Sequence, residues 1–146
     1  MNRYIKFDVE QFMRDSIEWD DKLKKLNDEL ESIPEIRGAS GEIHSCGSIS
    51  NPTQNTALSR QEVEEKIQRI VNYQAAFQYA WDRVSDYDRE MITGFFFAPG
   101  PIYEFVRLWV KANASNERYC YRDRNAALNH FRTQIERWMR AHGYDV

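Results

Sequence analysis

Apolar residues in the first half of the chain recur at alternating intervals of four and three, a spacing that predicts two long helices. The first stripe is formed by Phe12, Ser16, Trp19, Leu23, Leu26, Leu30 and Ile33. The second is formed by Val63, Ile67, Ile70, Gln74, Phe77, Trp81 and Val84. This heptad spacing keeps one side of a helix turned toward a partner helix. We therefore expect two helices that pack along their stripes.

The two stripes are of equal length, which favours an antiparallel hairpin within one chain. In that pairing the small Ser16 meets the large Trp81. The flanking pairs are Phe12 with Val84 and Leu23 with Gln74. Residues 34–58 hold three of the six glycines and two of the four prolines, which predicts a flexible loop. A loop of this length also permits parallel helices, or stripes that pair between two chains.

Three shorter helices are predicted in the second half. Ser85 is a suitable N-cap for a helix that ends at Ala98-Pro99-Gly100, and Pro101 then suits the first position of the next. Asn113 favours a left-handed stop, and Ser115 or Asn116 can cap the final helix. No long segment alternates with period two. The predicted fold is all-α: a helical hairpin in residues 1–84, then a trihelical helix-turn-helix unit in residues 85–146.

Charge is divided unequally along the chain. Residues 101–146 hold 8 Lys and Arg against 5 Asp and Glu, whereas residues 1–100 hold 12 against 18, giving the total of −3. An acidic body with an arginine-rich helix indicates a phosphate-binding surface that the net charge conceals. The alternative to a phosphate-binding surface is an ordinary solvated helix face that binds no ligand.

A helix-turn-helix binds DNA through the first turns of its second helix, which enter the major groove. Arginine forms bidentate hydrogen bonds with guanine or phosphate, and asparagine does so with adenine. The N-terminus of a helix binds phosphate. If Cys120, Ala127, Leu128 and Phe131 face the core, the residues expected to face outward are Glu117, Arg118, Tyr121, Arg122, Asn125 and either Asn129 or Arg132. The candidate DNA-binding residues are Arg107, Lys111, Ser115, Asn116, Arg118, Tyr121, Arg122, Asn125 and Arg132.

Several other classes of protein are disfavoured. The chain has no apolar run long enough for a membrane span and no secretory signal pattern, so we expect a cytoplasmic protein. Two cysteines, Cys46 and Cys120, do not suggest a disulfide framework. No spacing indicates a metal site, a cofactor loop or a catalytic constellation; Cys120 and His130 stand about 15 Å apart along a helix. We expect neither a cofactor nor an enzyme.

Three segments carry a family resemblance: SNPTQNTAL at residues 50–58, SDYDREMITGFFF at residues 85–97 and ASNERYCYRDRNAALNHF at residues 114–131. Their order resembles the small phage-encoded transcriptional regulators of the RinA/ArpU type, whose C-terminal parts look like region four of bacterial sigma factors. The resemblance implies a regulator of late phage genes in a bacterial host, which binds double-stranded DNA on or near RNA polymerase. The chain departs from that pattern at Glu117, Tyr119, Tyr121 and Asp123, where Ser, Thr, Arg or Lys are usual.

Two other functions remain open. A helical adaptor would bind a protein such as RNA polymerase, and its arginines Arg118, Arg122 and Arg124 would be held in ion pairs. A small DNA-packaging (terminase) subunit would form a ring. A DNA-binding regulator would instead gain affinity as a homodimer on two half-sites.

Overall fold

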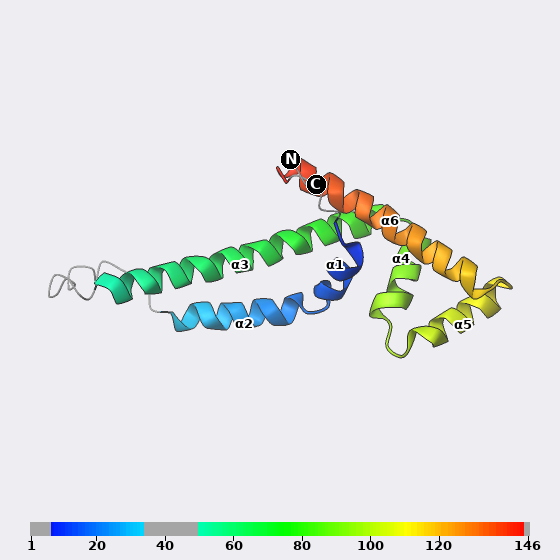
Figure 1. The fold of residues 1–146 in the computed structure, drawn as a ribbon, viewed down its shortest axis with the longest axis horizontal. Helices are drawn as coiled ribbons and strands as arrows, with labels where there is room; N and C mark the ends of the chain where they lie inside the picture. The colour runs from blue at the N-terminus through cyan, green and yellow to red at the C-terminus, as the bar shows by residue number, and fades with distance from the viewer. Residues whose placement is uncertain (1–6, 34–49, 145–146) are drawn as a thin grey trace. The chain divides into compact units, whose positions relative to one another are not determined.

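The computed structural model describes residues 7–33 and 50–144, without the side chains of residues 50–58. Every regular element in these ranges is helical, so the predicted all-α class is confirmed. In chain order, and as labelled in Figure 1, the elements are α1 (Val9–Ser16), α2 (Trp19–Ser32), α3 (Ser50–Arg83), α4 (Asp86–Ile92), η3 (Thr93–Phe97), α5 (Ile102–Asn113) and α6 (Glu117–Ala141).

The predicted loop of residues 34–58 is too long at its C-terminal end. Helix α3 begins at Ser50, so Pro52 is its third residue. The first N–H groups of a helix have no partner within it, and a proline is therefore tolerated in the first turn. Residues 34–49 lie outside the described residues.

The chain divides into two compact units, one made of residues 1–17 and 74–146 and the other of residues 18–73. The sequence instead suggested a boundary between residues 84 and 85. The difference arises because α1 and the last turns of α3 belong with α4, α5 and α6.

The hairpin unit contains α2 and the part of α3 up to Tyr73, and the two helices run antiparallel (Figure 1). The rings of Trp19 and Tyr73 stack with centroids 6.0 Å apart, and Arg60 Nη1 donates to the carbonyl of Ile33 at 3.5 Å. The antiparallel hairpin that the sequence favours is therefore present within one chain. The predicted register sets Leu23 beside Gln74. In the structure Trp19, which lies one turn earlier in α2, packs on Tyr73, so the predicted register is wrong by about one turn.

The first predicted helix is broken at Ile17 and Glu18, where α1 ends and α2 begins. Ser16 Oγ donates to the carbonyl of Met13 at 2.6 Å, a local bond that competes with continuation of the helix. Helix α1 buries Val9, Phe12 and Met13 in the larger unit. The ring of Phe12 lies 6.4 Å from that of Phe77, two turns before the expected partner Val84.

Helix α6 supplies the centre of the larger unit. Its Cys120, Phe131 and Ile135 are fully buried, together with Met13 of α1 and Met91 of α4. The ring of Phe131 lies 5.1 Å from that of Phe77. The burial of Cys120 and Phe131 agrees with the inward positions expected for them from the sequence.

Side-chain hydrogen bonds define the end of α3 and the start of α4. Ser85 Oγ accepts from the backbone N–H of Asp88 at 3.1 Å, as expected for an N-cap. Arg89 donates to the carbonyls of Trp81 and Val84, at 2.7 and 3.0 Å, and so satisfies the end of α3. The helix then widens into the π-helical turn η3, which ends at Phe97.

Candidate nucleic-acid interface

Helices α5 and α6 are joined by a turn of three residues. Ala114 adopts a left-handed conformation with φ 48°, and the N–H of Ser115 donates to the carbonyl of Val110 at 3.1 Å. Asn116 caps α6, because its Oδ1 accepts from the N–H of Tyr119 at 3.3 Å. The left-handed residue is thus Ala114, one position after the expected Asn113, whose amide instead donates to Trp109. The turn has the length of a helix-turn-helix connection.

The cations of α5 point to solvent. Arg107 and Lys111 are both exposed, one helical turn apart, and neither forms an ion pair with any described residue. Leu108 between them is 59% exposed. The outer side of α5 therefore offers two unpaired positive charges beside an apolar surface.

Arg118 stands in the first turn of α6, next to the free N–H groups of the helix N-terminus. It is exposed and has no ion pair within the described part of the chain. Ser115 is half-buried, and the Oδ1 of Asn116 is engaged in the cap. Of the predicted residues at this end of α6, Arg118 is the one whose charge is open to a ligand.

Arg122 is exposed but already contacts a carboxylate. Its Nη2 lies 3.3 Å from Asp123 Oδ1, and its guanidinium lies over the Tyr119 ring at 4.6 Å from the centroid. Asp123 is itself held in place, because Tyr87 donates its hydroxyl proton to Oδ2 at 2.6 Å. The indole N–H of Trp109 donates to the same hydroxyl at 3.1 Å. This chain of bonds ties α4, α5 and α6 together.

Burial and the hydrogen bond to Asp123 raise the pKa of Tyr87 from 10.0 to about 12. The folded protein then holds this proton more tightly than the unfolded chain does. The resulting stabilisation is complete below pH 10 and is lost as the pH rises to about 12. We expect the Tm of the wild type to fall more steeply over this interval than that of Tyr87→Phe, as followed by circular dichroism. Parallel curves for the two proteins would contradict this role of Tyr87.

Tyr121 is only partly available. Its side chain is 43% exposed, and its ring lies 5.4 Å from the ring of Phe95 in η3. Part of Tyr121 therefore belongs to the packing between η3 and α6.

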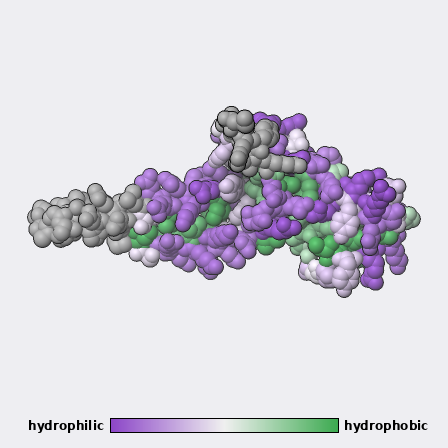
Figure 2. All heavy atoms as spheres, in the orientation of Figure 1, coloured by the Kyte–Doolittle hydropathy of each residue, from purple (hydrophilic) through white to green (hydrophobic). Residues whose placement is uncertain are grey.

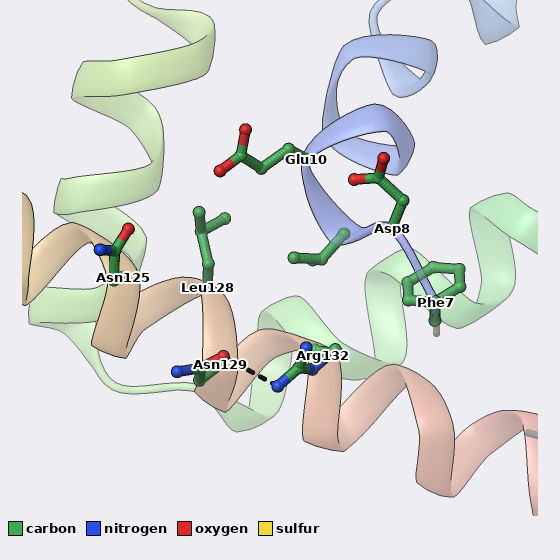
Figure 3. A pocket seen from close by; sticks show the side chains of 8 residues that line it. Phe7, Asp8, Glu10, Asn125, Leu128, Asn129 and Arg132 are labelled. Atoms are coloured by element: carbon green, nitrogen blue, oxygen red, sulfur yellow. Dashed lines mark hydrogen bonds between the residues drawn. The ribbon is translucent and has the colours of Figure 1, made fainter. Parts of the chain in front are cut away.

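Asn125 is exposed, with its Oδ1 accepting from Arg124 Nη1 at 3.0 Å, and Arg132 is half-buried. They line a cleft of about 500 Å³ whose other wall comes from α1 and the residues before it. Figure 3 shows the carboxylates of Asp8 and Glu10 across the cleft from Asn125, Leu128 and Arg132, with Arg132 bonded to Asn129. An acidic segment thus lies opposite the middle of the predicted binding helix, close to Asn125 and Arg132.

Arg124 shows the same effect more strongly. Its Nη1 lies 3.1 Å from Glu10 Oε1, and its side chain is only 16% exposed. The guanidinium also lies 5.4 Å from the ring centroids of Phe95 and Phe96. Arg124 is therefore a structural residue that attaches α1 to α6.

Other reactive groups give no further site. Cys120 is buried and free, and burial together with the nearby carboxylates of Asp123 and Glu117 raises the pKa of its thiol. His130 is exposed and lies 2.9 Å from the buried carboxylate of Asp88. Among the described residues, no group of three or more His, Cys, Asp or Glu could hold a metal ion. None of the described helices is long and apolar enough to cross a membrane.

Comparisons of the chain with protein-family models, with curated proteins and with solved structures find no match. The function must therefore be argued from the α5–α6 junction itself.

Proposed function

We propose that the protein binds double-stranded DNA through the α5–α6 junction. The observation that supports this most directly is Arg118, an exposed and unpaired cation in the first turn of a capped helix. Helix N-termini and arginines both favour phosphate, and arginine can also fork onto a guanine in the major groove. The three-residue turn has the length that presents such a helix to DNA.

The binding surface consists of Arg107, Lys111 and Arg118, with Arg122 at its edge. The two cations of α5 supply contacts to the phosphate backbone, which position the protein without specifying sequence. Arg122 would exchange Asp123 for a phosphate. Asn125 and Arg132 contribute less because Asp8 and Glu10 face them across the cleft, and Tyr121 contributes less because part of its ring packs on Phe95.

Carboxylates near this surface limit its affinity. Glu117 precedes Arg118 directly, and Asp123 competes for Arg122. A single unit with so few free cations binds weakly and with a strong dependence on salt, so that two units are needed on one DNA. The resemblance to RinA/ArpU-type proteins supports the finer proposal of a phage regulator that acts beside RNA polymerase.

The test compares Arg118→Ala with Arg137→Ala. Arg137 is also an exposed arginine of α6 without an ion pair to a described residue, but it lies about 28 Å farther along the helix. Fluorescence anisotropy with a pool of random duplexes at low salt should show binding by the wild type and by Arg137→Ala. Arg118→Ala should bind about 5- to 150-fold more weakly if the side chain contacts a base.

The salt dependence separates two roles of Arg118. Loss of a phosphate contact reduces the slope of log K against log salt by about 1, equally for all sequences. Absence of any binding at low salt, or equal affinity of all three proteins, would refute DNA binding at this surface.

A protein-interaction adaptor is the second candidate, and a separate observation favours it. Arg122 and Arg124 contact carboxylates, while Ile102, Tyr103 and Leu108 of α5 are 48%, 70% and 59% exposed. Exposed apolar groups on one helix suit a protein partner better than a DNA groove. A chain that binds no DNA but binds RNA polymerase through α5 would support this function.

A further inference from the structure

The α2–α3 hairpin leaves much of its apolar stripe uncovered. Among the described residues of this unit, only Trp19, Val63 and Ile70 are buried. Val71 is 42% exposed, and the stripe residues Leu23, Leu26, Leu30, Ile33 and Ile67 are half-buried. Hydrophobic residues are visible between hydrophilic ones along these helices in Figure 2. Two helices cannot enclose a core by themselves and ordinarily bury such a stripe against further helices.

One side of the hairpin forms an apolar groove with a basic rim. The groove has a volume of about 350 Å³, and Leu26 and Ile70 are its apolar residues. Its rim consists of Lys22, Lys25, Lys66 and Arg69. Lys22 pairs with Glu18 at 3.5 Å, whereas the other three cations form no ion pair with any described residue.

An acidic band adjoins this basic rim. Glu29 follows Lys25 by one turn of α2, while Glu62 and Glu65 precede Lys66 and Arg69 by one turn of α3. Residues four apart share a helix face. The two helices are antiparallel. The acidic residues of α2 and of α3 are therefore displaced from the basic residues in the same direction along the hairpin. The open side therefore carries a positive band and a negative band next to each other.

We propose that the hairpin pairs with the hairpin of a second copy of this chain, antiparallel, to form a four-helix bundle. A two-fold axis between the two bands sets the basic band of each copy against the acidic band of the other. Leu26 and Ile70 of the two grooves then bury one another. A two-fold interface must be self-complementary, and adjacent bands of opposite charge meet that condition.

The charge pattern favours a second copy over an acidic peptide or another protein surface. An acidic peptide that covered the whole open side would match the basic rim but would meet Glu29, Glu62 and Glu65 with like charge. A second copy matches both bands at once. The proposal stands whether or not the chain binds DNA, since it concerns only residues 18–73.

The test uses two complementary variants of the full chain. Variant A is Lys66→Glu with Arg69→Glu, and variant B is Glu62→Lys with Glu65→Lys. Each places like charges opposite each other in the bundle, so each alone should dimerise at least about 100-fold more weakly than the wild type. An equimolar mixture restores opposite charges and should form a heterodimer.

Light scattering gives the mass of each protein, and native mass spectrometry identifies the heterodimer. The control is Lys24→Glu, an exposed cation of α2 that does not line the groove, which should remain a dimer. Circular dichroism verifies that the variants keep the helix content of the wild type. The proposal would be overturned if the wild type were a monomer or formed a ring. It would also be overturned if variant A or variant B alone were fully dimeric, or if their mixture formed no heterodimer.

Discussion

Replacement of Phe131 by alanine is expected to lower the free energy of unfolding of the larger unit by about 3–5 kcal/mol. The side chain is 0% exposed and is among the largest fully buried side chains of the described chain. Its ring lies 5.1 Å from Phe77 of α3 and 6.5 Å from Phe12 of α1. Removing it leaves a cavity where three helices meet, and close-packed neighbours refill such a cavity only in part.

Urea denaturation followed by tryptophan fluorescence measures this loss, because the unit contains Trp81, Trp109 and Trp138. Phe131→Leu keeps most of the buried volume and should cost about 1.5 kcal/mol or less. Arg137→Ala, on the exposed side of the same helix, should change stability by about 0.5 kcal/mol or less. A similar loss for all three variants would show that the site is not close-packed.

Gly94→Ala is expected to destabilise the same unit by about 1–3 kcal/mol. Gly94 is buried in η3, and a Cβ at this position would overlap the ring of Phe105 far inside van der Waals contact. Withdrawal of the half-buried Phe105 ring would disturb its edge-on contact with Phe95 at 5.2 Å. The glycine thus allows α5 to approach the π-helical turn closely.

A double-mutant cycle with Phe105→Ala tests the cause of this loss. If the overlap is responsible, the double variant should be more stable than the sum of the two single losses predicts, by at least about 0.5 kcal/mol. Simple additivity would mean that Gly94 matters for another reason, such as backbone conformation. Thermal unfolding by circular dichroism provides the four stabilities.

The sequence was sufficient to predict structural features that are determined by residues close together in the chain. The all-α class, the antiparallel direction of the hairpin and the caps at Ser85 and Asn116 all follow from spacing or from a side chain three residues away. The hairpin register was wrong because a heptad stripe repeats: a shift by one turn still sets apolar residues against each other. The break after α1 had one local signal, the small polar Ser16 within the stripe.

The candidate site was predicted less completely. The sequence identified Arg107, Lys111 and Arg118 as outward cations, and the structure places them so. It did not reveal that Glu10 binds Arg124 or that Tyr87 binds Asp123, contacts that join residues 114 and 36 positions apart. Such pairs leave no periodic trace in one sequence. The apolar Val9 and Met13 lie outside the first stripe, and both are buried where α1 packs in the larger unit.

The contact between Arg122 and Asp123 has a thermodynamic consequence for any anion that reaches this surface. An incoming group that takes the place of Asp123 gains only the difference between its own attraction to Arg122 and that of the carboxylate. Because Arg122 is 67% exposed, solvent weakens both attractions, and an exchange of this kind contributes little to the strength of a complex. It favours short residence times and makes selectivity depend on geometry, since only a ligand that positions its oxygens better than the resident carboxylate is preferred.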